Sequence, residues 1–242
     1  MTMTNAGERR TSADARPAPV DDVVVAIDGP AGSGKSTVSH AVAERTGLRY
    51  LDTGSTYRAL TWALLRLGTP VDDPDAVEAA ARGVGLALQL DPMPGAVSRV
   101  LVDGKPVESE LRAPAVNEAV SAVSAVPAVR EQLVALQRSV MESGGVVAEG
   151  RDVGTVVCPA ADVKVFLTAS AAERARRRGN AGAPAESAEQ VARRDHIDSS
   201  RATSPTRASA DAVVLDSTDR PVDDVVAEIV RLVEAARARR AR

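Results

Sequence analysis

The sequence predicts a doubly wound α/β fold, in which a parallel sheet of about five strands carries helices on both faces. Short valine-rich apolar runs alternate along the chain with amphipathic stretches. Continuous apolar runs of this length are typical of strands buried on both faces of a parallel sheet. Their alternation with helical patterns indicates successive βαβ units. The clearest strand candidates are residues 23–27, 146–149, 163–167 and 212–216.

The composition favours one domain that carries inserted segments. The chain has 242 residues, which suffice for one α/β core and would be cramped for two unrelated domains. Its 30 Lys and Arg against 33 Asp and Glu give a formal net charge of −3. No overall positive field therefore attracts nucleic acid or an anionic membrane, and we expect neither as a partner. The single cysteine, Cys158, excludes a disulfide framework, and we expect it to be a small core residue.

The N-terminal segment is polar and lacks the apolar stretch of a secretory signal, so we expect residues 1–20 to be a disordered tail. No apolar run reaches the length of about 18 residues needed to span a bilayer. The expected location is therefore the cytoplasm.

The predicted core is interrupted by two inserted segments. After the strand 23–27 comes a glycine-rich loop and then a helical pattern that Gly47 closes. The first insert contains helical patterns and a hairpin, in which GLALQL and SRVLVDG alternate around turn-prone DPMPG. The second insert is arginine-rich, opens on a capping box at Ser170–Glu173, and precedes a last helix that runs from Pro221 to about Ala236. We assign residues 21–51, 146–169 and 206–242 to the core, 52–145 to the first insert and 170–205 to the second.

GPAGSGKS, residues 29–36, has the spacing of a phosphate-binding loop between a buried strand and a helix. Glycines allow successive backbone N–H groups to surround phosphates, a lysine reaches the outer phosphates, and a serine hydroxyl reaches Mg²⁺. This motif predicts ATP or GTP binding with Mg²⁺ held through Ser36. The predicted ATP-binding residues of the loop are Gly29, Pro30, Ala31, Gly32, Ser33, Gly34, Lys35, Ser36 and Thr37.

Two further segments place polar residues at the ends of predicted strands, where open α/β sheets bind ligands. LDTGSTYR opens a helix with Asp52, Thr53, Tyr57 and Arg58, and EGRDVGTVV follows strand 146–149 with Arg151 and Asp152. No asparagine begins the Asn-Lys-x-Asp element that is typical of guanine-specific switch proteins. A phosphoryl-transfer enzyme needs a pocket for an acceptor and cations around the transferred group, and these segments could supply both.

Six segments of the sequence resemble those of bacterial cytidylate kinases, the CMP- and dCMP-specific branch of the nucleoside monophosphate kinases. They occur in the family's order from about residue 23 to the C-terminus: GPAGSGKST, LDTGSTYR, SAVSAVPAVR, EGRDVGTVV, VKVFLTAS and RRDHIDSSRATSP. The resemblance implies an acceptor-binding insert with a small antiparallel sheet and a mobile lid, which in this sequence is short and arginine-rich. It also implies transfer of a phosphoryl group from MgATP to CMP or dCMP.

The resemblance further implies roles for individual residues. Ser121, Arg130 and Asp152 match positions that hold cytosine. A carboxylate can accept a hydrogen bond from the N4 amine of this base. Three other residues, Tyr57, Arg194 and Asp198, match positions that hold the sugar. The last group matches positions that bind the acceptor phosphate or the transferred group, and it consists of Arg58, Arg151 and Arg201. We expect these three arginines to act in catalysis together with Lys35.

The lid departs from the family pattern because only GNAGAPAESAEQV separates RARRR from ARRD. Arg174, Arg177 and Arg178 could contact ATP phosphates or could form a solvated helix face, and we assign Arg174 and Arg178 to ATP. If a helix begins near Ser187–Gln190, Arg194, Asp198 and Arg201 share one face and His196 points away, as a residue without a catalytic role.

Two alternatives stay open from the residues alone: a kinase for another nucleoside monophosphate or small acceptor, and a nucleotide-binding regulator or nucleic-acid-associated ATPase. We expect a monomer whose partners are ATP and CMP or dCMP.

Overall fold

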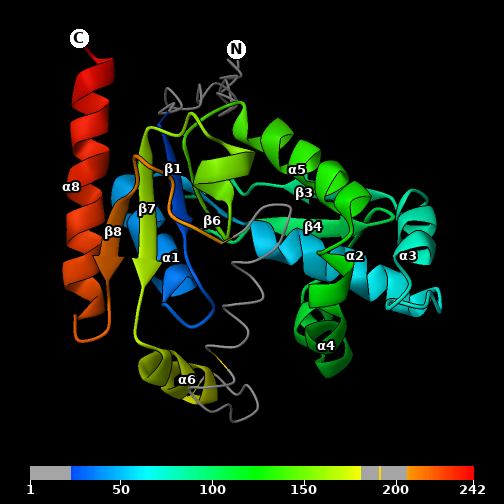
Figure 1. Ribbon diagram of the computed structural model, residues 1–242. Coiled ribbons are helices and arrows are strands. Elements are labelled where there is room, and N and C mark those ends of the chain that lie inside the picture. The colour runs from blue at the N-terminus through cyan, green and yellow to red at the C-terminus, as the bar shows by residue number, and fades with distance from the viewer. Residues whose placement is uncertain (1–22, 181–190, 192–205) are drawn as a thin grey trace, which may run out of the picture.

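The computed structural model describes residues 23–180, 191 and 206–242 (Figure 1). Several predictions lie outside these residues. They concern the N-terminal tail 1–20, the helix expected near Ser187–Gln190, and the residues Arg194, His196, Asp198 and Arg201.

The core is a five-stranded sheet in the order β2-β6-β1-β7-β8, and every neighbouring pair is parallel. All five residues of the central strand β1 are buried, which explains why its sequence is continuously apolar until the last residue. The predicted doubly wound parallel sheet is confirmed. The strands are β1 (Val24–Asp28), β2 (Arg49–Asp52), β6 (Val146–Gly150), β7 (Val163–Thr168) and β8 (Val213–Asp216).

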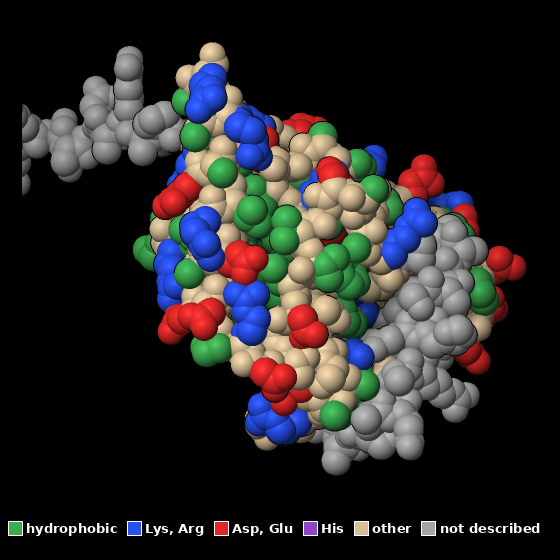
Figure 2. All heavy atoms as spheres, turned by 60° about the vertical axis from the view of Figure 1, so that its left-hand side comes forward, with side chains coloured by type: hydrophobic (Ala, Val, Ile, Leu, Met, Phe, Trp, Pro, Cys, Tyr) green, Lys and Arg blue, Asp and Glu red, His purple; other side chains and the backbone are tan. Residues whose placement is uncertain are grey.

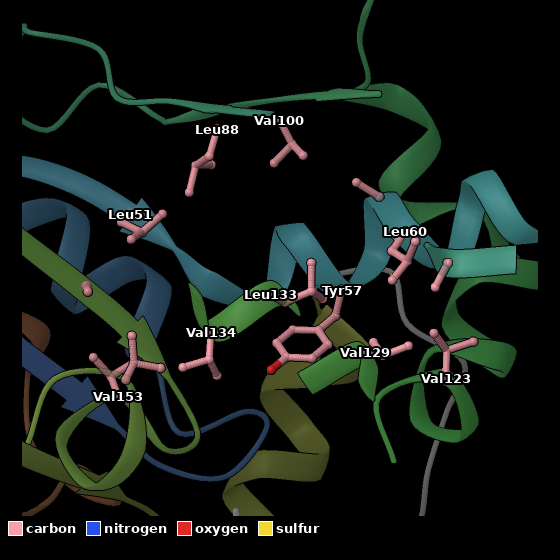
Figure 3. Packing of buried hydrophobic residues seen from close by; sticks show 14 of the residues in the cluster. Leu51, Tyr57, Leu60, Leu88, Val100, Val123, Val129, Leu133, Val134 and Val153 are labelled. Carbon is pink, nitrogen blue, oxygen red and sulfur yellow. The ribbon is translucent and has the colours of Figure 1, made fainter. Parts of the chain in front are cut away.

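Helices cover both faces of this sheet and form two separate apolar cores (Figure 1). On one face, Val25 and Ile27 of β1 pack with helices α1 (Lys35–Thr46) and α8 (Val222–Arg240). On the other face, Val24 and Ala26 belong to the core of helices α2 (Thr53–Arg66) and α5 (Pro127–Met141). Figure 3 shows the second core, where the Tyr57 ring lies among apolar side chains that include Val129 and Leu133.

The first insert contains the predicted hairpin within a three-stranded antiparallel sheet. Strands β3 (Leu86–Gln89), β4 (Arg99–Val102) and β5 (Lys105–Pro106) pair in that order. Asp103 and Gly104 both have positive φ, +50° and +77°, as a tight turn of the primed type requires. Leu88 and Val100 place one face of this sheet on the α2–α5 core (Figure 3). The insert is completed by α3 (Pro74–Ala81), the 3₁₀ turn η1 (Ser109–Arg112) and α4 (Pro114–Val123).

One further helical element follows the end of β6, and another follows the end of β7. A π-helical turn, η2 (Val153–Val157), comes after β6, and helix α6 (Ala171–Asn180) comes after β7. The Ser170 hydroxyl accepts a hydrogen bond from the Glu173 N–H at 3.3 Å, as the predicted capping box requires. Among the described helices, none alone is long and apolar enough to cross a membrane. Only α4 and α5 together pass that test, and they are bent by 103°.

Helix α8 is longer than predicted, since it continues to Arg240 rather than ending near Ala236. The extra turn is held by contacts with distant parts of the chain. Arg237 donates to the Thr46 carbonyl at 2.6 Å, and Arg240 donates to both carboxylate oxygens of Asp162 at 2.8 and 3.0 Å. The basic C-terminal sequence therefore contributes to docking α8 on the core.

Candidate active site

Three of the predicted segments meet because the strands that precede them are neighbours. Strands β2, β6 and β1 are adjacent and parallel, so their carboxyl ends lie at one edge of the sheet. The loop of residues 29–34 leaves β1, helix α2 leaves β2, and the segment 151–152 leaves β6. This edge is where open α/β sheets bind ligands.

The loop after β1 has the backbone that its glycines predict. Gly29, Gly32 and Gly34 have φ of +151°, +79° and +91°, a range that other residues rarely adopt. A Cβ atom on Gly29 would lie 2.0 Å from the Leu167 carbonyl oxygen, so β7 leaves no room for a side chain there. Helix α1 begins directly after Gly34, and its first N–H groups open toward the loop.

Lys35 folds over this loop, and its Nζ donates to the Pro30 carbonyl oxygen at 2.8 Å. Burial and, after it, the positive charge of Arg151 lower the pKa of Lys35 to about 8. The carboxylates of Glu149, Asp28 and Asp52 oppose this change. Lys35 therefore lies beside Arg151 and faces the acidic ends of three strands.

Four arginines form a cationic cluster around Arg58, and one of them, Arg151, also acts on Lys35. Burial lowers the pKa of the Arg58 guanidinium, and the charges of Arg112, Arg151 and Arg178 lower it further, whereas Asp52 opposes them. Arg58 is held by hydrogen bonds to the Asn117 side chain and to the Leu111 carbonyl oxygen, the latter at 3.4 Å. Repulsion among grouped cations is relieved by an anion, so this cluster fits phosphate groups.

Asp52 and Thr53 organise the start of α2. The Asp52 carboxylate caps the helix by accepting from the Gly54 and Ser55 N–H groups at 2.8 and 3.3 Å. The Thr53 hydroxyl donates to the Glu149 carbonyl oxygen at 2.7 Å and so ties α2 to β6. Both residues lie at the predicted edge, and both have partners within the fold.

Arg130 of α5 and Asp152 form a buried ion pair, with exposed side-chain fractions of 9% and 8%. Arg130 also donates to the Ser124 carbonyl oxygen at 3.2 Å, and its guanidinium lies over the Tyr57 ring at 5.4 Å from the centroid. The Arg130 Nε atom is buried and has no hydrogen-bond partner among the described residues. A buried donor without a partner is costly, which is consistent with a ligand at this pair.

Ser121 lies apart from the Arg130–Asp152 pair. It is exposed on α4, and its carbonyl oxygen accepts from the Ser124 hydroxyl at 3.1 Å. Because Ser124 in turn accepts from Arg130, the structure connects Ser121 to the pair through one residue.

Two acidic residues of the site were not predicted. Each carboxylate oxygen of Asp28 accepts a hydrogen bond from a backbone N–H of the segment after β6, one from Val153 and one from Gly154, both at 2.7 Å. Burial raises the pKa of Asp28 to about 6 despite these two bonds, and the charge of Asp152 contributes to the rise. Asp28 therefore joins the end of β1 to the segment that carries Arg151 and Asp152.

The second is Glu149, which accepts a hydrogen bond from the Tyr50 hydroxyl at 2.5 Å. Burial raises the pKa of Glu149, as does the charge of Asp52, while hydrogen bonds from Tyr50 and Ser36 oppose the rise. A cavity of about 450 Å³ adjoins this cluster. Its lining residues are Ser36, Thr37, His40, Ala41, Tyr50, Asp52, Val97 and Arg112.

The arginines assigned to ATP from the sequence differ in their surroundings. Arg174 is 5% exposed, and its guanidinium donates to the Ala169 and Ala31 carbonyl oxygens at 2.9 and 3.4 Å. Arg178 lies close enough to Arg58 to lower its pKa. Arg178 thus belongs to the cationic cluster, whereas Arg174 contacts the back of the phosphate loop.

Comparison with known proteins gives one consistent family. A sequence model described as cytidylate kinase matches residues 25–235. The cytidylate kinase of Rhodococcus opacus is 49% identical over 219 residues, which cover 87% of this chain and 94% of that protein. That of Mycobacterium avium is 49% identical over 220 residues, covering 88% and 95%. A bifunctional pantoate ligase/cytidylate kinase of a Synechococcus species is 48% identical over 86% of this chain and 44% of that protein.

Proposed function

The chain belongs to the cytidylate kinase family, and we propose that it transfers the γ-phosphoryl group of ATP to CMP or dCMP at the carboxyl edge of its five-stranded sheet. One observation supports this site above all others. The phosphate loop follows β1, Asp152 follows β6 and pairs with Arg130, and the cationic cluster is centred on Arg58 in the helix that follows β2. A donor phosphate, an acceptor phosphate and a base can therefore be held in line.

The ATP phosphates bind in the loop of residues 29–34 and at the start of α1. The loop N–H groups and the helix N-terminus donate to the phosphate oxygens, and Thr37 adds a hydroxyl. Lys35 exchanges its hydrogen bond with Pro30 for bonds to the outer phosphates. Binding an anion also raises the lysine pKa again, which restores its positive charge.

Mg²⁺ would bind with ATP rather than in a cage made by the protein. The described residues contain no group of three or more His, Cys, Asp or Glu side chains that could hold a metal ion. The Ser36 hydroxyl lies beside Glu149 and near Asp52, an all-oxygen set that suits this ion, directly or through water. When bound, Mg²⁺ neutralises charge on the phosphates.

The acceptor base binds at Arg130 and Asp152. The Asp152 carboxylate can accept from the exocyclic N4 amine of cytosine, and Arg130 can donate to the acceptor edge of the ring. Uracil would present a carbonyl oxygen to the carboxylate, so two acceptors would face each other. Ser121 and Tyr57 are proposed to border the base and the sugar.

The transfer needs positioning and charge stabilisation rather than a general base, because the acceptor phosphate is already ionised near neutrality. A CMP phosphate oxygen attacks the γ-phosphorus, the bond from the γ-phosphorus to its bridging oxygen breaks, and ADP leaves. Arg58 and Arg151 are proposed to neutralise the transferring group. Arg112 and Arg178, which share their cluster, add to the same field.

An acceptor panel tests this function. ADP release from MgATP should be measured with CMP, dCMP, UMP, AMP and GMP, and the product identified as the matching diphosphate. CMP and dCMP should be the best acceptors. ADP release that is independent of any acceptor would favour an ATPase, and a preference for AMP or GMP would favour another kinase.

A further inference from the structure

Helix α6 contains four arginines, and two of them, Arg174 and Arg177, donate to carbonyl oxygens of the phosphate loop. The Arg177 Nη1 atom donates to the Ser33 carbonyl oxygen at 3.3 Å and to the Ser217 hydroxyl at 2.9 Å. Its Nη2 atom donates to the Ser217 carbonyl oxygen at 2.6 Å, and its Nε atom donates to Glu173 at 2.7 Å. Every nitrogen of this guanidinium therefore has a partner within the fold.

Ser217, directly after β8, joins Arg177 in a junction of four segments. Its side chain is buried, and its hydroxyl oxygen lies 3.0 Å from the carbonyl oxygens of both Ser33 and Thr168. The junction thus joins the phosphate loop, the end of β7, Arg177 of helix α6 and the segment after β8. The Ser33 carbonyl oxygen is its common acceptor, since both Arg177 and Ser217 donate to it.

The orientation of this carbonyl fixes the next N–H group. In a planar trans peptide, the C=O of one residue and the N–H of the next point in opposite directions. With the Ser33 oxygen turned toward α6, the Gly34 N–H points to the other side of the loop, where phosphates bind. Arg174 makes the same kind of contact with the Ala31 carbonyl oxygen, and the Gly32 N–H points away from α6 in the same way.

We propose that Arg177 is a positioning residue for ATP, which orients the Ser33–Gly34 peptide for phosphate binding without contacting ATP itself. This inference rests on the proposed binding of ATP at the loop. Glycine at position 34 has φ of +91° and could adopt several other conformations, so an external contact is needed to hold its peptide in one orientation. A Cβ on Gly34 would lie 3.5 Å from the Arg177 Nη1 atom, which shows how closely the guanidinium approaches the loop.

Arg177 already has a carboxylate partner, Glu173, which it shares with Arg176. Hydrogen bonds from Arg176 and Arg177 lower the pKa of Glu173 to about 2, so this carboxylate stays ionised beside both arginines at physiological pH. A phosphate-binding role would require Arg177 to break its bonds to Ser33, Ser217 and Glu173. The planar fork is the feature that the junction uses, and a lysine cannot reproduce it.

The chain offers a matched control. Arg176 is the preceding residue on α6, pairs with the same Glu173 at 2.7 Å, and has a side chain that is 64% exposed. Arg176→Ala, Arg177→Ala, Arg177→Lys and Ser217→Ala should be compared with the unmodified protein. The readouts are KM for ATP, KM for CMP, kcat, and affinity for a non-hydrolysable ATP analogue, with melting temperature as the structural check.

Arg177→Ala should raise KM for ATP and weaken analogue binding by about tenfold, while KM for CMP changes less than twofold. Arg177→Lys should fail to restore ATP binding, and Arg177→Ala with Ser217→Ala should cost less than the product of the two separate effects. Arg176→Ala should leave both KM values unchanged.

Three results would overturn the proposal. Unchanged ATP binding in Arg177→Ala would contradict the positioning role. The proposed function would still stand in that case if the unmodified protein phosphorylates CMP. Recovery by Arg177→Lys would indicate that the charge binds phosphate directly. Equal loss of affinity for ATP and CMP, with a matching loss of melting temperature, would indicate a general structural role.

Discussion

Lys35 should make ATP binding depend on pH in a range where an ordinary lysine would stay charged. Burial, aided by Arg151, lowers its pKa to about 8 before the nucleotide binds. As the pH rises through 8, the free enzyme loses this positive charge, so kcat/KM for ATP should fall by about tenfold per pH unit. The value of kcat should fall less, because bound phosphates favour the protonated lysine.

The measurement is a pH profile from about 6.5 to about 9.5, with Lys35→Arg as the control. Arginine stays protonated throughout this range, so the variant should be weaker at neutral pH and show no alkaline decline. A wild-type profile that stays flat above pH 8 would argue against the lowered lysine pKa.

Asp28 should be required for CMP binding although it is expected to touch neither substrate. Asp28→Ala removes the acceptor for the Val153 and Gly154 N–H groups, which are buried at this position. The free energy of unfolding should fall by about 2 kcal/mol, and KM for CMP should rise because the segment carrying Arg151 and Asp152 loses its anchor. Urea unfolding and steady-state kinetics test both effects. A variant with normal KM for CMP would show that other contacts position the segment.

At this scale, the sequence predicted residues that belong to a motif and missed residues defined by contacts. The phosphate loop was predicted because its glycines, lysine and serine have a spacing that chemistry requires. The Arg130–Asp152 pairing follows from packing of α5 against η2, and the resemblance alone brought Arg130 into consideration. Arg112 had no sequence signal, because it lies on a 3₁₀ turn that only the insert's fold brings to the site.

Among the elements, the junction of β6 with η2 is packed too closely for any side chain at Gly150. A Cβ atom there would lie 2.5 Å from the Thr53 Oγ1 atom and 2.7 Å from a Val153 methyl carbon. Gly150→Ala should therefore lower the free energy of unfolding by about 1–3 kcal/mol and reduce kcat/KM for CMP.

Gly179→Ala is the matched control. It lies in helix α6, and no described atom lies within 4 Å of the place that a Cβ would take, so alanine should be neutral or slightly stabilising there. Thermal unfolding of both variants measures the difference. Equal stability of Gly150→Ala and the unmodified protein would contradict the packing described at this junction.

Most elements could be predicted because their periodicity matches their burial. The buried strands β1 and β6 open with continuous apolar runs, and the hairpin of the insert reads as alternation around turn residues. Strand β7 has Lys164 within its apolar run and alternates buried with half-buried residues. The π-helical turn η2 could not be predicted, because contacts with a distant strand stabilise it. The Asp28 side chain at the end of β1 accepts from two of its N–H groups, and the Asp152 carbonyl oxygen accepts from two others. The last turn of α8 depends likewise on Thr46 and Asp162.

For the whole molecule, the site results from strand order rather than from sequence proximity. Segments distant in the sequence meet because β6 lies between β2 and β1. The face shown in Figure 2 carries basic and acidic side chains interspersed, in keeping with a formal net charge of −3. Attraction of phosphates should therefore depend on the local cluster of Lys35 and the arginines, and not on the overall charge.

Arg130 and Asp152 are proposed to select cytosine at the same edge of the sheet that holds the ATP phosphates. The decisive quantity is the ratio of kcat/KM for CMP to that for UMP, in the unmodified protein and in Asp152→Asn, with melting temperature as a control for folding. We expect a strong preference for CMP that Asp152→Asn reduces by at least about tenfold, because an amide can also donate to the uracil carbonyl. An unchanged ratio in a folded Asp152→Asn variant would contradict this selection of cytosine by the buried pair.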